Sequence, residues 1–571
     1  MMPSKAFIRL VSLGAIFLDN VLAQDTSQDG LIWDKLETSP ELKWTDCYTQ
    51  LQCARFQVPL NYSNPEGDAA SIAVIRFPSP LANTADYKGP ILINPGGPGG
   101  SGVELMVQNG AELSQVLGPN FDIVSFDPRG VGRSTPRASF FDTEAQRRFF
   151  DTSFDVINAT SDGLARIWAR AQITGALATQ HNQKNIFEHF NTESTARDML
   201  RIVEAHGRKN IQYWGFSYGT VLGATFASLF PDRIDRLVLD ACQGVVDAEN
   251  YFATLWSNNL LDTDKTLQSF FDGCFEGGPD LCPFYESSPQ AISQKLDDLT
   301  HTIFLRPVPV QTKFSYGLVD YERLRITIFQ TLYSPYEAFP RLAQGLADLM
   351  HGNGTVLYQI LEQPVFDCAC GAPAPLMSIP DGGRAIMCTD GAEVRDTVDE
   401  LEPYVQGLLR DSQWGEVWAS IRIGCSAWPK QEKRHFKGPF LGNTSHPILW
   451  IGNTADPVTP IAGARKMAKG FPGSVLLTQD SPGHCSIAAP SVCTIGFVRG
   501  YFMNGTLPDE GVVCPVIQPI FSGQPVDIGG VLGPQKRSPS ASFSGGTEEK
   551  DEDLVQALAH LRQNFRVPTP F

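Results

Sequence analysis

The segment Gly215-Phe-Ser217-Tyr-Gly219 places a serine between two glycines, directly after an apolar run and before a helical pattern. This Gly-x-Ser-x-Gly spacing between strand and helix is typical of a nucleophile elbow, a sharp turn that exposes the serine hydroxyl. The glycines are needed because side chains at their positions would collide with the adjacent strand and helix. An ordinary strand-to-helix turn is the alternative. We predict that Ser217 is a nucleophile for acyl transfer.

A second glycine-rich segment, Asn94-Pro-Gly-Gly-Pro-Gly-Gly-Ser-Gly102, follows another apolar run. It lacks the Gly-Lys-Ser/Thr ending of a phosphate-binding loop and the Gly-x-Gly-x-x-Gly spacing of a dinucleotide site. Backbone N–H groups can approach a substrate carbonyl closely where side chains are absent, so the segment suits an oxyanion hole. We predict that the amides of Gly97 and Tyr218 are its two donors.

An acid and a base follow much later in the chain, each just past an apolar run. Asp456 lies in Gly-Asn-Thr-Ala-Asp-Pro-Val-Thr-Pro, and His484 lies on the glycine-containing loop Ser-Pro-Gly-His-Cys-Ser. The chain order of serine, acid and histidine is that of the α/β hydrolases. We therefore predict that Ser217, Asp456 and His484 form a catalytic triad.

Two other acids, Asp127 and Asp240, also end apolar runs. Neither stands in the right position before a histidine loop, so neither is expected to be the acid of the triad. Asp127 is expected to hold its own loop together with Arg129.

The elements that must position these residues alternate between strands and helices. Short β-branched runs bounded by turn residues indicate buried parallel strands, and helical patterns lie between them. This alternation predicts an α/β fold with a mostly parallel sheet and helices on both faces. The strand runs are 90–94, 122–126, 211–214, 236–240, 447–451 and 474–478, the helical patterns include 194–206 and 220–230, and an antiparallel hairpin is expected at 55–60 and 71–77.

A long stretch interrupts the alternation and predicts an inserted, mainly helical cap over the sheet. A smaller helical insertion is expected at about 140–190. After Cys514 the composition shifts to Pro, Gly and Ser, which favours a disordered tail over a short amphipathic helix at 554–565. The predicted parts are a signal peptide at 1–23, the two parts of the core at 45–245 and 436–515, the cap at 246–435 and the tail at 516–571.

The N-terminus and the cysteines indicate secretion. Basic residues, an apolar run and small residues before Gln24 form the pattern of a cleaved signal peptide. Five Asn-x-Ser/Thr sequons are expected to be glycosylated, at Asn61, Asn158, Asn353, Asn443 and Asn504. The 12 cysteines suit disulfides, because their spacing does not match a zinc site. The expected pairs are Cys47/Cys53, Cys274/Cys282, Cys493/Cys514 and, at longer range, Cys388/Cys425.

Composition excludes several classes of protein. With 42% apolar residues in 571, the chain can build a large core and is not disordered throughout. The formal net charge of −17 disfavours nucleic acid and anionic membranes as partners. No later segment approaches about 18 consecutive apolar residues, so no membrane span is expected. Oligomeric state is left open.

The motifs together resemble those of secreted α/β-hydrolase serine exopeptidases of the tripeptidyl aminopeptidase and prolyl aminopeptidase family. The resemblance rests on Asn94–Gly102, Asp127-Pro-Arg-Gly-Val-Gly-Arg-Ser134, Trp214-Gly-Phe-Ser-Tyr-Gly-Thr220, Asp456-Pro-Val-Thr-Pro460 and the C-terminal segment from Gly483 to Cys514. It spans about 45–515 and is poor in the cap. Cys242 and Cys485 depart from the family pattern, and either could alter the pocket or form an extra disulfide.

This resemblance implies a secreted, extracellular aminopeptidase that releases short peptides or single residues through an acyl-enzyme. Its partners are peptide substrates, and no cofactor or metal is implied because side chains and backbone carry the chemistry. An esterase or lipase-like hydrolase would use the same triad and stays an alternative. A non-catalytic binding protein on the same fold is a further alternative, which the complete triad disfavours.

Overall fold

One sheet contains most of the strands of the protein. The computed structural model describes residues 32–151, 156–242, 251–313, 315–361, 379–431, 435–522 and 548–565. Within them the sheet has 11 strands in the order β1-β3-β4-β6-β5-β7-β8-β11-β12-β13, with β2 paired to β3. Its strands are β1 (Thr38–Ser39), β2 (Thr45–Asp46), β3 (Gln52–Pro59), β4 (Ala69–Phe77), β5 (Gly89–Asn94), β6 (Phe121–Phe126), β7 (Ile211–Phe216), β8 (Ile234–Asp240), β11 (Leu449–Ala455), β12 (Val475–Pro482) and β13 (Val513–Cys514).

The sheet is parallel from β6 to β13, whereas β4 is antiparallel to both β3 and β6. Every residue of β5, β6 and β7 is buried, as expected for parallel strands that are covered on both faces. The α/β fold class and the N-terminal hairpin are thus confirmed. Several strands are longer than predicted: β11 continues to Ala455 and β12 to Pro482, which brings both strand ends close to Asp456 and His484.

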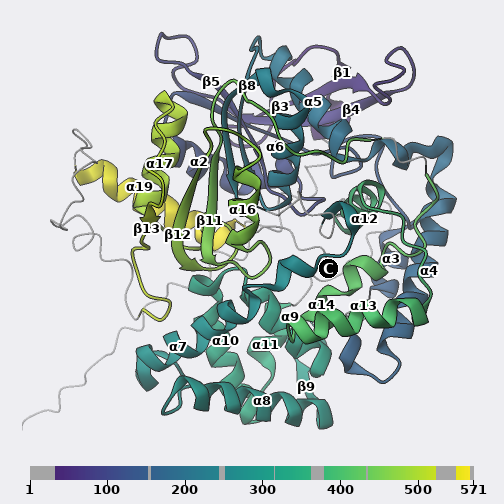
Figure 1. The fold of residues 1–571 in the computed structure, drawn as a ribbon, viewed down its shortest axis with the longest axis vertical. Helices are drawn as coiled ribbons and strands as arrows, with labels where there is room; N and C mark the ends of the chain where they lie inside the picture. Colours follow the sequence, from purple (N-terminus) through teal and green to yellow (C-terminus); the bar gives the residue numbers. More distant parts are fainter. Residues whose placement is uncertain are drawn as a thin grey trace, which may run out of the picture.

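Helices cover both faces of the sheet (Figure 1). Their apolar side chains join two separate clusters of buried residues, one on each face. The helices of one face are α5 (Thr192–Ala205), α6 (Tyr218–Leu229) and α16 (Ile461–Ala468), and those of the other are α2 (Gly102–Leu117), α17 (Val492–Asn504) and α19 (Glu548–Asn564).

A mainly helical region lies beyond the ends of β11 and β12 (Figure 1). Its elements are α7 (Thr263–Leu281), α8 (Pro289–Leu305), the hairpin β9 (Val308–Gln311) and β10 (Tyr316–Val319), α9 (Tyr321–Thr331), α10 (Pro335–Met350), α11 (Thr355–Ile360), α12 (Ile379–Asp390), α13 (Val398–Asp411), α14 (Gly415–Trp418) and α15 (Ser420–Ile423). We call this region the cap; its limits at 246 and 435 stay predictions. Where the smaller insertion is predicted, the structure has α3 (Glu144–Phe150) and α4 (Gly163–His181).

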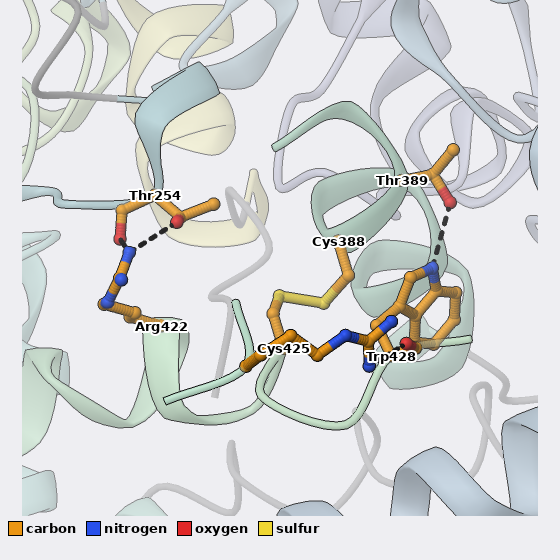
Figure 2. Close-up of a disulfide and its surroundings, with 7 residues drawn as sticks. Thr254, Cys388, Thr389, Arg422, Cys425 and Trp428 are labelled. Atoms are coloured by element: carbon orange, nitrogen blue, oxygen red, sulfur yellow. Dashed lines mark hydrogen bonds between the residues drawn. A yellow bond between two sulfur atoms is a disulfide. The ribbon is translucent and has the colours of Figure 1, made fainter. Parts of the chain in front are cut away.

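Among the described residues, four disulfides join the four pairs of cysteines that the sequence predicts. Cys388–Cys425 links the end region of α12 to the segment after α15, and it lies between two hydrogen bonds, Arg422 to Thr254 and Trp428 to Thr389 (Figure 2). Cys242 and Cys485 are buried and form no extra disulfide among the described residues. Cys368 and Cys370, like the predicted signal peptide at 1–23, lie outside the described residues.

The prediction of a disordered tail is wrong for residues 548–565. Helix α19 packs on α2, and Leu558 and Leu561 of the helix, with Phe565 directly after it, are buried in the same cluster as the apolar face of α2. The ring of Phe565 meets that of Phe216 edge-on, with centroids 4.9 Å apart. The charged composition around 548–553 concealed this contact, because the burial depends on a helix whose residues are as much as 448 positions away, as between Glu112 and His560.

Substituting Phe565→Ala should lower the free energy of unfolding by about 3–5 kcal/mol, because it removes a buried aromatic ring from the cluster on α2. Urea unfolding followed by tryptophan fluorescence measures the change. Gln563→Ala, at an exposed position in the last turn of α19, is the matched control and should change stability by less than about 0.5 kcal/mol. Equal stability of the two variants would contradict the packing of α19.

Candidate active site

Ser217 occupies the tight turn between β7 and α6. Its backbone has φ 54° and ψ −120°, a conformation that a non-glycine residue adopts only where its surroundings enforce it. The Ser217 N–H donates to the backbone carbonyl of Asp240 at the end of the next strand. A Cβ on Gly215 would lie 2.4 Å from the carbonyl oxygen of Gly219, so the turn requires glycine there. The predicted elbow conformation is thus present.

The glycine-rich loop after β5 packs directly against this turn. Gly96 has φ 93°, and a Cβ there would lie 2.5 Å from the carbonyl oxygen of Phe216. The close approach brings Gly97 to the wall of the cavity that Ser217 also lines. Tyr218 is the first residue of α6, so its N–H lies among those that have no acceptor within the helix. Both predicted oxyanion donors therefore belong to the immediate surroundings of Ser217.

Asp456 and His484 are in contact, as the sequence predicts. The Nδ1 atom of His484 lies 3.0 Å from each carboxylate oxygen of Asp456, and both side chains are buried. Three backbone N–H groups also donate to this carboxylate, from Val458 at 3.0 Å, Thr459 at 2.8 Å and Cys485 at 3.2 Å. Two of these donors lie in the turn after β11 and one lies in the turn after β12. The carboxylate is therefore held from both turns and faces the imidazole.

The other contacts of His484 fix the ring and leave its outer nitrogen open. Its backbone N–H donates to the carbonyl of Tyr333 at 2.9 Å, and the two rings meet edge to face with centroids 5.2 Å apart. Thr459 Oγ1 lies 3.0 Å from Nδ1. Nε2 is buried and has no hydrogen-bond partner among the described residues. A nitrogen held in this way can accept a proton from a group that enters the adjoining space.

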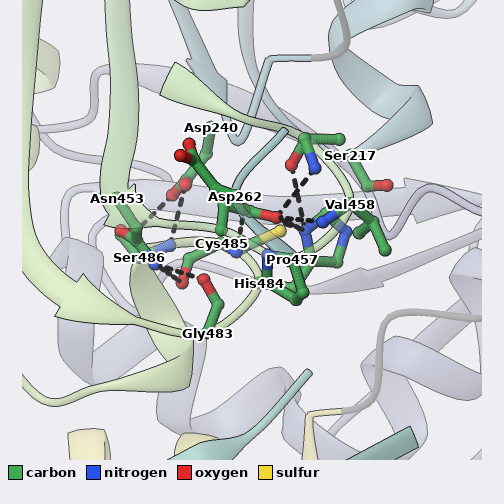
Figure 3. Close-up of polar contacts among 12 residues, drawn as sticks. Ser217, Asp240, Asp262, Asn453, Pro457, Val458, Gly483, His484, Cys485 and Ser486 are labelled. Atoms are coloured by element: carbon green, nitrogen blue, oxygen red, sulfur yellow. Dashed lines mark hydrogen bonds and ion pairs between the residues drawn. The ribbon is translucent and has the colours of Figure 1, made fainter. Parts of the chain in front are cut away.

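Asp240 supports the histidine loop from the other side. Figure 3 shows residues 483–486 with Asp240 on one side and Pro457 and Val458 on the other. The carboxylate of Asp240 accepts hydrogen bonds from the backbone N–H of Ser486 at 2.9 Å and from its hydroxyl. Complete burial raises the pKa of Asp240 to about 6, although the bonds from Ser486 oppose this. The sequence rightly excluded Asp240 as the partner of His484, but it gave no sign of this supporting role.

The expectation for Asp127 is only half right. Asp127 does hold its own loop, since it accepts hydrogen bonds from the N–H of Arg133 at 2.7 Å and from the hydroxyl of Ser101 at 2.6 Å. Arg129 does not take part: it forms a buried ion pair with Asp198 on α5. The partner was missed because Asp198 is 69 residues away and lies on a different element.

A small cavity of about 20 Å³ connects the turn of Ser217 with the cap. Its described lining has no charged residue and consists of Gly97, Pro98, Ser217, Trp256, Asn259, Tyr333, Met387, Trp418, Val458 and Thr459. Five of these residues belong to the cap region: Trp256, Asn259, Tyr333, Met387 and Trp418. No sequence motif marked them, so their position could not be predicted from the sequence. Aromatic and apolar walls with few polar groups are typical of sites for organic substrates.

The five predicted glycosylation sites are all exposed, at Asn61, Asn158, Asn353, Asn443 and Asn504. Their accessibility permits modification, which stays a prediction. Within the described residues, no group of three or more His, Cys, Asp or Glu side chains could hold a metal ion. None of the described helices is long and apolar enough to cross a membrane.

Comparison with known protein families finds a match in each of two separate parts of the chain. The family described as "alpha/beta hydrolase fold" matches residues 89–279, which include Gly97 and Ser217, and the family described as "TAP-like protein" matches 411–514, which include Asp456 and His484. The chain therefore has an α/β-hydrolase fold, and its C-terminal segment is similar to TAP-like proteins.

Curated relatives are similar over most of their length. Serine protease Hip1 of Mycobacterium tuberculosis is 28% identical over 83% of this chain and 91% of the relative. Tripeptidyl aminopeptidase of Streptomyces lividans is 26% identical over 83% of this chain and 86% of the relative. Carboxylesterase B of Mycobacterium tuberculosis is also 26% identical, over 83% of this chain and 90% of the relative.

The raised pKa of Asp240 predicts a pH dependence of stability. A folded-state pKa of about 6, above the ordinary value of an aspartate, means that ionisation costs stability in the folded protein. The contribution of Asp240 is therefore most favourable below about pH 4 and is lost as the pH rises through 6. Relative to wild type, Asp240→Asn should become more stable as the pH rises from 4 to 7.

Urea unfolding of both proteins at a series of pH values measures this difference. Asp232→Asn, at an exposed position just before β8, is the control and should show a much flatter difference. A stability difference for Asp240→Asn that does not change with pH would contradict the prediction.

Proposed function

We propose that this protein is a serine peptidase that cleaves short peptides or single residues from the N-termini of its substrates. The observation that carries the proposal is the pair of Asp456 and His484, in which the carboxylate holds Nδ1 and Nε2 has no hydrogen-bond partner among the described residues. The names of the relatives, a serine protease and a tripeptidyl aminopeptidase, support the same class of reaction.

The proposed reaction begins with attack of Ser217 Oγ on a substrate carbonyl. Because Asp456 accepts the Nδ1 proton, His484 presents a lone pair on Nε2 and can take the proton from the serine hydroxyl. The carbonyl oxygen becomes negative as the tetrahedral intermediate forms, and the amides of Gly97 and Tyr218 stabilise it by hydrogen bonds. One such donor typically contributes about 3–4 kcal/mol to the transition state.

The second half of the reaction returns the proton. The imidazolium of His484 donates its Nε2 proton to the leaving amine, so the C–N bond breaks and an acyl-enzyme on Ser217 remains. Water then attacks the acyl carbonyl, with His484 as general base, and releases the acyl product together with the regenerated serine. The buried carboxylate of Asp456 stabilises the imidazolium in both steps, and no cofactor is required.

Ester hydrolysis is the second candidate, because a relative is named carboxylesterase B and the described lining of the cavity has no charged residue. An ester needs the same nucleophile and oxyanion donors but a weaker general acid, since its leaving group departs more readily. The two candidates therefore differ in substrate and not in the residues that act.

We further propose that the protein is secreted and glycosylated. The four disulfides suit an oxidising compartment, and each of the five sequons is exposed. A chain expressed in secreting eukaryotic cells should appear in the medium with an N-terminus at Gln24, as determined by N-terminal sequencing. Treatment with an endoglycosidase should lower its apparent mass. Retention of Met1, or the absence of a mass change, would contradict the corresponding part of the proposal.

Substituting Ser217→Ala should abolish turnover, with a loss in kcat of at least about 10⁴-fold, because the acyl-enzyme can no longer form. Release of p-nitroaniline from tri-alanine p-nitroanilide measures the rate. Ser228→Ala is the matched control: it removes a hydroxyl of helix α6 that donates to the carbonyl of Ala224 at 2.8 Å. Full activity of Ser217→Ala would rule out the proposed reaction.

The choice between peptidase and esterase rests on wild-type turnover of two substrate sets. Aminoacyl and tripeptidyl p-nitroanilides are compared with short p-nitrophenyl esters under the same conditions. Turnover of the esters alone would reject the peptidase proposal. Mass spectrometry of the fragments released from a long peptide then shows how many residues leave at each cut.

A further inference from the structure

The cavity beside Ser217 has two buried polar atoms in its cap wall that lack partners. Asn259 Oδ1 and Trp256 Nε1 form no hydrogen bond with any described residue, and their side chains are almost completely buried. Both residues line the same cavity as Ser217 and Gly97. Burying such groups without a partner costs stability, so their presence beside the reacting serine calls for an explanation.

The orientation of the Asn259 amide follows from its other contact. Its Nδ2 donates to the carbonyl oxygen of Val458 at 2.7 Å, and a carbonyl oxygen can only accept. The side chain therefore cannot be turned over, and its oxygen is the atom left without a donor. Val458 lies in the turn that holds Asp456, so Asn259 is also placed at a fixed position relative to the proposed triad.

Trp256 is fixed just as firmly. Its backbone has φ 59°, a conformation that is costly for a bulky residue and marks a position enforced by its surroundings. The ring packs edge-on against Tyr251 at 5.3 Å and against Trp418 at 6.5 Å between centroids. Two residues earlier, Thr254 is held by Arg422 next to the Cys388–Cys425 disulfide (Figure 2). The indole N–H is thus presented by a rigid segment.

The two atoms form a complementary pair, one acceptor and one donor. A peptide group offers the matching N–H and C=O, whereas a terminal ammonium carries a charge, and the described lining of the cavity has no charged residue to compensate it. We propose that Asn259 Oδ1 accepts the N–H of the substrate residue whose carbonyl Ser217 attacks, and that Trp256 Nε1 donates to a carbonyl of the preceding peptide. This inference rests on the proposed peptidase function.

The test compares tri-alanine p-nitroanilide with an analogue in which the third alanine is replaced by lactic acid. The analogue has an ester oxygen in place of the N–H that Asn259 is proposed to bind, while the anilide to be cleaved is the same. The ratio of kcat/KM for the peptide to that for the analogue should fall by about 5- to 100-fold in Asn259→Ala, because the variant no longer distinguishes the two substrates. Trp256→Phe should lower kcat/KM for both substrates about 5-fold or more, since both retain the carbonyl.

Thr263→Val is the matched control for a merely structural role of Asn259. Thr263 donates from the same segment to the carbonyl of Pro457, so it also tethers the turn of Asp456, but it does not line the cavity. This variant should change kcat/KM for both substrates by the same factor. Thermal unfolding checks that each variant is folded.

The outcomes separate the inference from the function on which it rests. Peptide turnover by wild type with an unchanged substrate ratio in Asn259→Ala would overturn the inference alone, as would an equal fall of that ratio in Thr263→Val or undiminished activity in Trp256→Phe. If wild-type protein releases no p-nitroaniline from the peptide, the proposed function fails and the inference with it.

Discussion

The left-handed backbone of Ser217 is the constraint on which the arrangement of the site depends. It reverses the chain between β7 and α6 within one residue, and so it places the hydroxyl beyond the sheet edge and the N–H of Tyr218 at the start of a helix. Gly96, in the loop after the neighbouring strand β5, leaves room for this turn, because a side chain there would collide with the carbonyl of Phe216. Similar positive φ angles at Ala241 and Cys485 show that two more strand ends turn sharply at this edge.

Two aspartates at the ends of adjacent strands divide the support of the histidine loop. Asp456, after β11, orients the imidazole, and Asp240, at the end of β8, binds the backbone and hydroxyl of Ser486 two residues further on. Because β8 and β11 are neighbours in the sheet, both carboxylates reach the same short loop from different directions. The loop that carries His484 is therefore held on both sides by buried ionisable groups. Burying two carboxylates lowers the stability of the folded protein, which favours a functional reason for the fixed position of this loop.

Much of the fold and the core of the site could be predicted from sequence, because their signals are local. Gly-x-Ser-x-Gly between strand and helix predicted the tight turn at Ser217, and strand ends followed by an acid or a histidine predicted the contact between Asp456 and His484. The four disulfides also followed from spacing. In contrast, the partner of Arg129, the role of Asp240 and the position of Asn259 depend on contacts across 69, 246 and 199 residues. No local sequence pattern indicates such contacts, because the residues near each side chain in sequence do not reveal which distant residue it meets in the fold.

The order of residues 548–565 could not be predicted for the same reason, because it depends on a contact with a distant part of the chain. The amphipathic pattern of the tail was visible, but the surface that receives it is built from α2 near the start of the core. Helix α2 also packs on β4, β6 and α17, but the part of its apolar face that α19 covers stays exposed until α19 has been synthesised. The nascent polypeptide must then carry an exposed apolar surface until residues 548–565 emerge from the ribosome. Premature termination shortly before residue 548 would leave that surface bare for good and make the product a substrate for chaperones and quality-control proteolysis.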